Sequence, residues 1–504
     1  MTGKKRPHIV LFNPDQWRGD VLGHLGNPAA VTPHLDRLAA EEAVSFRHAF
    51  CQNPVCTPSR CSFMTGWYPH VRGHRTMFHM LHAREGEPNL QRILRDKGYF
   101  VWWTSRNDLV PAQHGWEGEC DVRYTPRPAD FERWGHAPRP GLHRDQAWRG
   151  APDSDTYYSF FAGRLDKGAD EIYGDLDWGW VLGAREFILN YDQDRPLFLN
   201  LALGYPHPPY GVEEPWFGQI DRAKLPVRAP VSADPSKMPL TLEGLRQGQN
   251  MRGWTEERWT ELRAVYYGMC ARVDHQVGLI LDALRQAGMW DDTAFFFFSD
   301  HGDFAGDYGL VEKTQNTFQD CLTRVPFLVK PPRGVPVVPR VSEALVELVD
   351  FSATVYHLAG VEPGYDHFGR SLLPVLAGET DELRDAVFCE GGRRVGERQA
   401  MEAESLGLAD TPEKNPYWPR IRLQLSDERP WQGKAAMCRT RTHKYVRRLY
   451  EPDELYDLGR DPQELYNVID DPGQAEVLAR LRDRLLTWYV ETCDVVPFDA
   501  DRRW

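Results

Sequence analysis

Short apolar runs of strand length, each followed by a polar cluster, are the feature that most limits how this chain can fold. They occupy residues 8–12, 99–104, 197–203 and 295–298. Stretches with helical spacing of apolar residues separate them, and the longest has Thr255 as a candidate cap and Gly288 as a candidate stop. Strands that alternate with helices in this way predict an α/β fold, in which helices cover both faces of a large, mostly parallel sheet.

The pattern changes in the last quarter of the chain. Residues 376–433 are polar and predict irregular surface, residues 435–447 predict one strand, and residues 475–489 predict a closing helix with one apolar stripe. We therefore expect two units, a large α/β domain over residues 1–375 and a smaller α+β subdomain over residues 376–504.

Composition and charge exclude several classes of protein. With 41% hydrophobic and 26% charged residues, the chain of 504 residues is ordinary for a globular protein. Its net charge of −13 argues against nucleic acid or an anionic membrane as a partner. No apolar run approaches the roughly 20 residues that span a bilayer, which argues against membrane insertion. The N-terminus lacks the pattern of a secretory signal and the nine cysteines are scattered, so we expect a cytoplasmic protein.

Polar residues stand where the four predicted strands end. They are Asp15-Gln16, Ser105-Arg106-Asn107-Asp108, His207 and Asp300-His301. A single Asp after a strand is usually a turn or cap residue, and a single His is usually structural. The carboxyl ends of parallel strands, however, meet at one edge of a sheet, where sites form. The coincidence of four such clusters therefore predicts a functional site at that edge.

The segment Cys56-Thr57-Pro58-Ser59-Arg60 is the most specific element of the sequence. Thr57-Pro58 predicts the start of a helix and Gly66 its end, which places Cys56 at a helix N-terminus. Free backbone N–H groups and the helix dipole favour an anion there, and Arg60 lies one turn further along. The plain alternative is a buried cysteine before an ordinary helix.

This segment resembles the C-x-P-S-R sequence in which type I sulfatases have their cysteine oxidised to formylglycine. The resemblance covers most of the chain and includes Gly66-Trp-Tyr-Pro-His70, Gly98-Tyr99, His207-Pro-Pro, Ser299-Asp300-His301-Gly302, Lys313 and Glu454-Leu-Tyr-Asp-Leu. It places the chain in the alkaline phosphatase superfamily, close to arylsulfatases and phosphonate monoester hydrolases. It implies an alkaline-phosphatase-like fold and a sulfuric ester hydrolase that acts on aryl or carbohydrate sulfate monoesters.

The resemblance also implies a metal site. One divalent metal would be held by Asp15, Gln16, Cys56, Asp300 and His301. Cys56 would be oxidised to formylglycine, whose hydrated aldehyde, a gem-diol, supplies both the nucleophilic oxygen and a metal ligand. Gln16 stands where many members have a second Asp, and its carbonyl oxygen can still coordinate. Oxygen-rich ligation implies Ca²⁺, and the nitrogen of His301 leaves Mn²⁺ as an alternative.

Further roles and partners follow from the same resemblance. Arg60 would orient the gem-diol and the sulfate, Lys313 would hold a sulfate oxygen, and His207 would protonate the departing alkoxide. A formylglycine-generating enzyme would be a partner during maturation. The related phosphonate hydrolases make a homo-oligomer reasonable.

One stretch departs from the family pattern. Sulfatases commonly have Gly-Lys-x-His after the second strand, and this chain has Ser105-Arg106-Asn107-Asp108 instead. Arg106 could replace the Lys by forking onto two sulfate oxygens, and His74 is a second candidate to contact the substrate. Either Asp108 or His74 could act as the base that collapses the sulfated intermediate. An Asp beside a bound anion requires a screening charge.

Several functions remain open from the sequence. The departure keeps a phosphonate monoester or phosphodiester hydrolase, with the same formylglycine and metal, as an alternative. A non-catalytic protein that binds metal and anion with unmodified Cys56 is an alternative of another class. A thiol hydrolase built on Cys56 and His207 would not need the metal ligands. The polar segment 376–433 could roof the pocket and select the leaving group.

Overall fold

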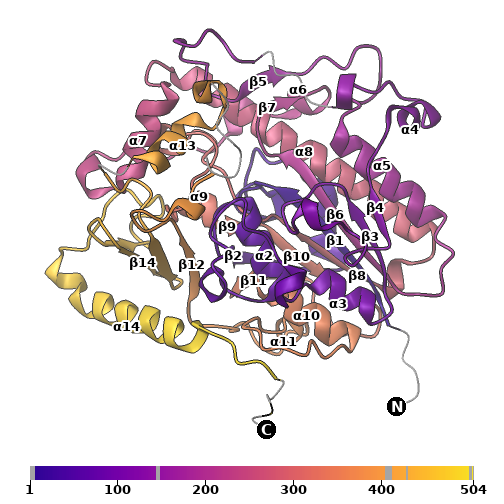
Figure 1. Cartoon of the computed structure of the whole chain (residues 1–504). Helices are drawn as coiled ribbons and strands as arrows, with labels where there is room; N and C mark the ends of the chain where they lie inside the picture. The colour runs from indigo at the N-terminus through magenta and orange to yellow at the C-terminus, as the bar shows by residue number, and fades with distance from the viewer. Residues whose placement is uncertain (1–5, 143–147, 403–410, 427–428, 499–501, 503–504) are drawn as a thin grey trace.

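The computed structural model describes residues 6–142, 148–402, 411–426, 429–498 and 502 (Figure 1). Its main element is a nine-stranded sheet. In spatial order the strands are β11 (Arg340–Glu347), β2 (Val44–Phe50), β10 (Phe327–Lys330), β8 (Thr293–Phe298), β1 (His8–Asp15), β6 (Leu197–Pro206), β3 (Phe100–Thr104) and β4 (Val122–Tyr124), and β9 (Arg324–Val325) pairs with β2. The strands from β8 to β4 are parallel, whereas β10 runs antiparallel to both of its neighbours. The predicted mixed, mostly parallel sheet is confirmed, and all four predicted strands lie in it.

Alternate residues of the central strand β1 face two different layers of helices. Val10 and Phe12 belong to one hydrophobic core, and Ile9 and Leu11 belong to the core on the opposite face. The first layer contains α1 (Pro33–Glu41), α5 (Leu176–Leu189) and α8 (Glu256–Gln286), and the second contains α2 (Cys56–Thr65), α3 (Leu90–Asp96) and α10 (Asp350–Ala359). The other elements are α4 (Pro128–Arg133), β5 (Phe161–Arg164), β7 (Tyr210–Val212), α6 (Trp216–Gln219), α7 (Leu240–Gln249), α9 (Asp320–Thr323), α11 (Leu373–Leu376) and α13 (Trp418–Leu425). Burial on both faces explains why these strands read as unbroken apolar runs.

A second, four-stranded antiparallel sheet forms the C-terminal part. Its order is β12 (Val387–Gly391), β13 (Ala435–Arg439), β14 (His443–Arg448) and β15 (Glu454–Asp457). Helix α14 (Ala475–Thr492) packs on this sheet, with Trp488 stacked on Phe388 at 4.6 Å between ring centroids. The α+β character and the closing helix are confirmed, while the boundary at residue 375 stays a prediction.

Two predictions for this part are wrong. The single strand predicted over residues 435–447 is a hairpin, because the side chain of Thr440 accepts two backbone N–H groups and turns the chain without Gly, Pro or Asn. Residues 376–433 are not wholly irregular surface, since they contain β12 and α13. Their polar side chains pair in the interior, as Arg420 does with Glu402 at 3.1 Å, so a polar composition imitates a surface.

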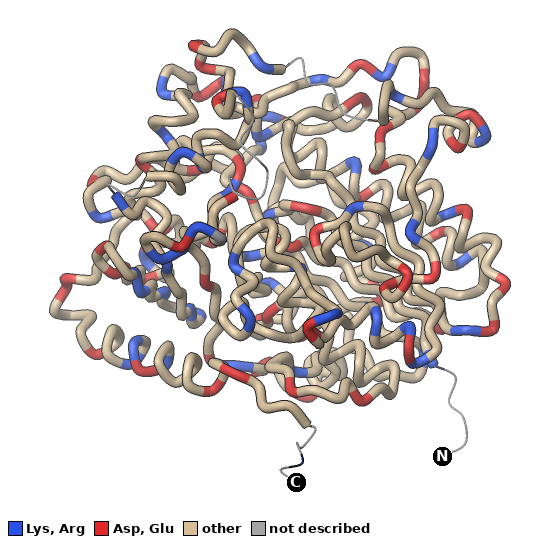
Figure 2. The backbone as a smooth tube through the Cα atoms, viewed as in Figure 1, with Lys and Arg blue, Asp and Glu red and all other residues tan. Residues whose placement is uncertain are grey.

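Charge and hydropathy agree with the exclusions drawn from the composition. Figure 2 shows acidic and basic residues interspersed around the fold. Within the part of the chain that the structure describes, no helix is long and apolar enough to cross a membrane. The cytoplasmic location stays a prediction.

Arg272 of α8 is a fully buried side chain that fixes α8 beneath the end of β6. It lies 2.6 Å from Asp175, 3.2 Å from Glu213 and 4.0 Å from the ring centroid of Tyr205. Its removal would leave two buried carboxylates without their cation. We therefore expect Arg272→Leu to lower the free energy of unfolding by about 3–5 kcal/mol, measured by urea denaturation followed by circular dichroism.

The matched control is Arg258→Leu on the same helix. Arg258 pairs with Asp155 at the surface, where both side chains are more than a third exposed. We expect this variant to lose at most about 1 kcal/mol. Equal losses in the two variants would contradict the assignment of Arg272 as a buried anchor.

Candidate active site

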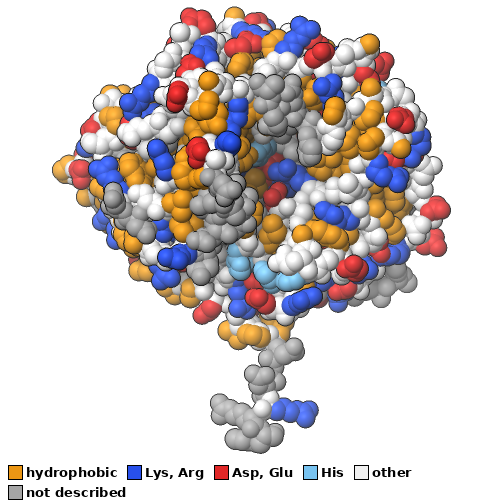
Figure 3. All heavy atoms as spheres, turned by 45° about the horizontal axis from the view of Figure 1, so that its top comes forward, with side chains coloured by type: hydrophobic (Ala, Val, Ile, Leu, Met, Phe, Trp, Pro, Cys, Tyr) orange, Lys and Arg blue, Asp and Glu red, His pale blue; other side chains and the backbone are white. Residues whose placement is uncertain are grey.

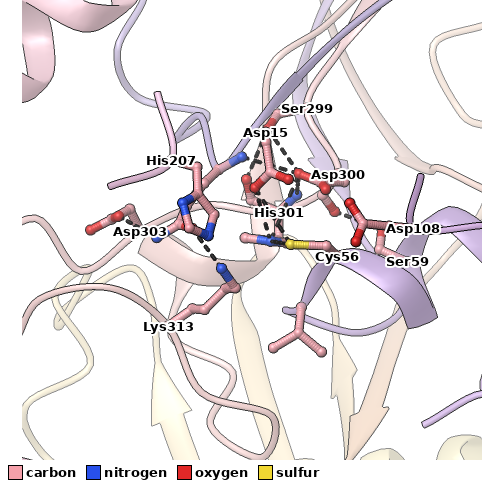
Figure 4. A network of polar contacts seen from close by, with 12 residues as sticks. Asp15, Cys56, Ser59, Asp108, His207, Ser299, Asp300, His301, Asp303 and Lys313 are labelled. Carbon is pink, nitrogen blue, oxygen red and sulfur yellow. Dashed lines mark hydrogen bonds and ion pairs between the residues drawn. The ribbon is translucent and has the colours of Figure 1, made fainter. Parts of the chain in front are cut away.

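Four predicted site residues converge at the carboxyl edge of the main sheet, where α2 begins (Figure 4). Asp15 is the last residue of β1, and Asp300 and His301 follow β8. One ligand atom from each of these residues and from Cys56 lies within 4.8 Å of the others. All four side chains are buried. The parallel topology thus gathers residues that are far apart in the sequence into one cluster.

The first turn of α2 is bound to both strand ends by its own side chains. Ser59 Oγ donates to the backbone oxygen of Asp300 at 2.6 Å. Arg60 Nη1 donates to Asn13 Oδ1 at 2.6 Å. The helix starts at Cys56, as predicted, so these two bonds fix Cys56 relative to β1 and β8.

Cys56 lies against the cluster through its sulfur. Its Sγ is 3.2 Å from His301 Nε2 and 3.5 Å from Asp15 Oδ1. Burial, and then the charge of Asp15, raise the pKa of the Cys56 thiol well above its ordinary value. An unmodified thiol in this environment is neutral near pH 7 and therefore a weak nucleophile.

The donor set of the cluster fits a divalent cation. His301 Nδ1 donates to the carbonyl oxygen of Gly302 at 2.8 Å, which leaves Nε2 without a proton, 3.7 Å from Asp15 Oδ1. Asp300 Oδ2 is buried and accepts no hydrogen bond among the described residues, although Arg60 Nη2 lies 2.8 Å away. Two buried carboxylates and an imidazole lone pair are donors that Ca²⁺, Mn²⁺ and similar ions bind.

Gln16 is held in one orientation by two partners. Its backbone has a φ of 72°, which is rare outside glycine. Its side-chain Nε2 donates to Asp303 Oδ2 at 2.5 Å, and its Oε1 accepts from Lys313 Nζ at 2.7 Å. Asp303 also accepts from the Tyr210 hydroxyl at 2.8 Å, and burial raises the pKa of Asp303 to about 7. Asp303 and Lys313 together therefore fix which way the Gln16 amide points.

Two arginines neutralise the buried carboxylates. Arg60 Nη2 lies 3.2 Å from Asp15 Oδ2, and Arg106 Nη2 contacts the same oxygen. Burial alone would raise the pKa of Asp15, but Arg106, His207 and Arg60 hold it well below its ordinary value. Asp108 Oδ2 lies 3.4 Å from Arg106 Nη2 and 3.8 Å from Arg60 Nε, so both arginines screen it.

Each of these two arginines also has an N–H donor that is not used within the described residues. The Nε atoms of Arg60 and Arg106 are buried and donate to no acceptor among the residues that the structure describes. A buried N–H group without a partner is costly, and an anion bound beside it removes that cost. The structure thus brings Arg106 to the cluster and leaves it equipped to bind an anion.

Lys313 and His207 close the other side of the cluster. Lys313 Nζ donates to Glu312 Oε1 at 2.6 Å. Burial alone would raise the pKa of Glu312, but the charges of Arg420 and Lys313 lower it to about 2. His207 Nδ1 donates to the carbonyl oxygen of Pro208 at 2.6 Å. Its Nε2 lies 3.9 Å from Glu312 Oε1. Burial, and then the charge of Lys313, hold the pKa of His207 well below its ordinary value.

The residues at the rim of the cluster are more exposed than those at its centre. The side chains of Asp15, Asp300 and His301 are 0% exposed, whereas those of Arg106, Asp108 and His207 are 22%, 20% and 16% exposed. Figure 3 shows a hollow in this face of the molecule in which charged and histidine side chains are visible, with hydrophobic side chains at its sides. A ligand reaching the cluster would therefore pass Arg106, Asp108 and His207.

His74 has partners of a structural kind. Its Nε2 lies 3.1 Å from Glu87 Oε1, and its ring stacks on His79 at 4.9 Å between centroids. These contacts give no support to a role in binding substrate, and that role stays a prediction.

Three residues of the site were not predicted from the sequence. Asp303 and Glu312 stand next to recognised motifs, two residues after His301 and one before Lys313, so their position was a usable signal. Tyr417, whose hydroxyl lies 3.5 Å from the Nε2 of His207, comes from a polar segment without any local motif.

Comparison with known proteins identifies the class of protein that this fold and site define. A family model described as Sulfatase matches residues 7–361, and the chain belongs to this family. The chain is 26% identical to the multifunctional alkaline phosphatase superfamily protein PehA of Trinickia caryophylli, over 97% of this chain and 96% of that protein. It is also 26% identical to a choline-sulfatase of Rhizobium meliloti, over 100% of this chain and 91% of that protein.

Solved structures with a similar fold include a phosphonate ester hydrolase. The crystal structure of the phosphonate monoester hydrolase of Agrobacterium radiobacter matches with a TM-score of 0.74 and 26% identity, over 97% of this chain and 96% of that one. The predicted family and alkaline-phosphatase-like fold are confirmed.

The position of Asp303 generates a prediction for metal binding. In Asp303→Asn an NH₂ group can face the Gln16 NH₂ group, so the Gln16 amide loses one of the two contacts that fix its direction and only Lys313 still holds it. We expect the affinity for the divalent metal to fall about 10- to 100-fold, measured by calorimetric titration of the metal-free protein.

The control is Asp470→Asn, since Asp470 is 79% exposed and forms only a long surface pair with Lys237. This variant should bind metal as the wild type does. An unchanged affinity in Asp303→Asn would show that the orientation of Gln16 does not matter to the metal.

Proposed function

We propose that the protein is a sulfatase that hydrolyses organic sulfate monoesters, with an aryl or carbohydrate alcohol, to the alcohol and inorganic sulfate. The observation that carries the proposal is the contact of Cys56 with the ligand atoms of Asp15 and His301. A residue that serves as both nucleophile and metal ligand must lie in such contact. Similarity to a choline-sulfatase supports the same reaction class.

The chemistry requires two groups that mature with the enzyme. Formylglycine at residue 56 would supply a hydrated aldehyde oxygen as nucleophile, and a divalent ion would withdraw charge from the bound ester. The ion would be held by residue 56 together with Asp15, Gln16, Asp300 and His301. Mostly oxygen ligands favour Ca²⁺, and the imidazole of His301 keeps Mn²⁺ as the alternative. A formylglycine-generating enzyme would be the maturation partner, and a homo-oligomer stays a prediction.

The chain's own cations would hold the ester. Lys313 Nζ and the unpartnered Nε atoms of Arg60 and Arg106 are the donors for its terminal oxygens. His207 would give a proton from Nε2 to the departing alkoxide, because its Nδ1 is occupied by the carbonyl oxygen of Pro208. A bound anion beside His207 would raise its pKa toward the range that this role requires.

A phosphonate monoester or phosphodiester hydrolase is the second candidate. These esters carry one negative charge, as a sulfate monoester does. Arg106 and Asp108 stand where many sulfatases have Lys and His, and the similarity to a phosphonate monoester hydrolase favours this candidate. Asp108, screened by two arginines, would then be the base for the last step, and it is the base we propose for sulfate esters too.

The binding-only and thiol alternatives have less support. A protein that binds metal and anion without turnover needs no proton donor, yet His207 lies at the open side of the cluster. A thiol hydrolase needs an ionisable thiol, and the surroundings of Cys56 keep its proton on sulfur.

Modification of Cys56 is the first test of the proposal. Protein produced together with a formylglycine-generating enzyme should contain, at position 56, a residue that has lost two hydrogens and sulfur and gained oxygen, as measured by peptide mass spectrometry. Its activity should disappear with a chelator and return with Ca²⁺ or Mn²⁺. Cys56→Ala should reduce kcat/KM by at least about 10³-fold.

Matched protein produced without that enzyme is the control and should be inactive. Aryl sulfate and aryl phosphonate monoesters are compared on the same preparation, and the larger kcat/KM decides between the two candidate reactions. Full activity with unmodified Cys56, or activity indifferent to the chelator, would overturn the proposal.

The lowered pKa of His207 predicts a pH dependence. A proton donor is active below its pKa, so kcat/KM, which reports the free enzyme, should fall as pH rises through that low value. The bound anion raises the pKa in the complex, so kcat should fall only at a higher pH. Initial rates across pH, at low and at saturating substrate concentration, measure the fall of kcat/KM and the fall of kcat. His207→Gln should lower kcat and abolish both falls with rising pH. If kcat/KM and kcat of the wild type fell at the same pH, the assignment of His207 would be contradicted.

A further inference from the structure

Three aromatic rings form a continuous row that begins at His207 and leads away from the cluster. The Tyr417 ring lies 6.4 Å from the His207 ring, the Phe160 ring lies 5.4 Å from that of Tyr417, and the Trp148 ring is stacked 5.4 Å from Phe160, all between centroids. Trp148 and Tyr417 are partly exposed and Phe160 is buried. The row is thus an apolar wall with two accessible rings.

The geometry of His207 places the organic half of a substrate against this wall. Its Nδ1 is bonded to the carbonyl oxygen of Pro208, so Nε2 is the atom that can serve a leaving group. Tyr417 Oη lies 3.5 Å from that same Nε2. An ester oxygen that receives a proton from Nε2 therefore lies near the Tyr417 hydroxyl, and Tyr417 is the ring of the row nearest to the group attached to this oxygen.

The wall is held in a fixed position. The Tyr158 hydroxyl donates to the backbone oxygen of Glu413 at 2.7 Å, which joins the two chain segments that supply the rings. The backbone N–H of Tyr417 donates to Asn415 Oδ1 at 2.9 Å. Phe160 has a φ of 57°, a strained conformation for a bulky residue that persists where the surroundings enforce it. A rigid wall binds a rigid partner with little loss of entropy.

Charge differs between the two ends of the wall. The Arg420 guanidinium lies 5.2 Å from the Tyr417 ring centroid, but Glu312 at 2.5 Å and Glu402 at 3.1 Å neutralise it. The Arg149 guanidinium lies 5.8 Å from the Trp148 ring centroid and places a cation at that end of the row. A neutral, flat ring gains by stacking on the wall without meeting this cation unfavourably. A cationic alcohol would also be attracted by the rings near Tyr417, so the test below includes one.

We propose that Tyr417, Phe160 and Trp148 form the leaving-group subsite, and that its substrates are esters of aromatic alcohols. This proposal rests on the proposed function, and it narrows the substrate class from aryl or carbohydrate esters to aryl esters. Tyr417 is the specificity-determining residue of the subsite, since it is the ring next to His207.

Binding of stable sulfonates tests the subsite without depending on turnover. Phenylmethanesulfonate carries a methylene in place of the ester oxygen of phenyl sulfate, and propanesulfonate carries the same anionic head on an aliphatic chain. Calorimetry on the metal-loaded protein should show tighter binding of the aromatic compound. In Tyr417→Leu its affinity should fall about three- to tenfold, while that of propanesulfonate stays within about twofold. Tyr417→Phe, which keeps the ring, should retain the aromatic preference.

The remaining outcomes separate the subsite from the reaction. Tyr466→Leu, at a tyrosine that is 63% exposed, is the control for loss of an aromatic ring, and thermal melting confirms that each variant is folded. Equal losses for both sulfonates in Tyr417→Leu, or no loss, would overturn the subsite alone. Tighter binding of 3-(trimethylammonio)propanesulfonate would replace it with a site for cationic alcohols. Failure of the wild type to bind any of the three would overturn the proposed function as well.

Discussion

The burial of Asp15 and Asp300 side by side is the constraint on which the rest of the site depends. Two like charges about 4 Å apart repel by about 4 kcal/mol at an effective dielectric constant of 20, so a cation beside both carboxylates stabilises the pair. Arg60 supplies one, since its Nη2 lies 3.2 Å from Asp15 and 2.8 Å from Asp300. Arg60 lies one turn into α2, so the charge that stabilises the carboxylates also fixes the helix that begins with Cys56. The residues proposed as metal ligands and as nucleophile are therefore positioned by one interaction.

The sequence predicted the sheet, the position of α2 and a cluster of polar residues at one edge of the sheet from local patterns, whereas the assignment of that cluster as a metal site came from the resemblance to sulfatases. Strands buried on both faces read as apolar runs, and the polar residues that follow them must meet at one edge of a parallel sheet. The sequence could not predict Tyr417 or the true nature of residues 376–433. Buried polar pairs such as Arg420 with Glu402 look like surface in composition, and only tertiary contacts distinguish the two. The hairpin at Thr440 was missed for a similar reason, since a side chain replaces the usual turn residues.

The choice between sulfate and phosphonate rests on how many oxygens the site can bind. A sulfate monoester presents three terminal oxygens, whereas a phosphonate monoester presents two and a carbon substituent. Arg106 Nη2 is committed to Asp15 and Asp108, so this group cannot also hold a substrate oxygen without losing a partner. The Nε atoms of Arg106 and Arg60, however, are buried without an acceptor among the described residues. Together with Lys313 Nζ they give three donors, one for each terminal oxygen of a sulfate ester. A carbon substituent would leave one of the three unpaired, so the donors of this chain match sulfate better than phosphonate.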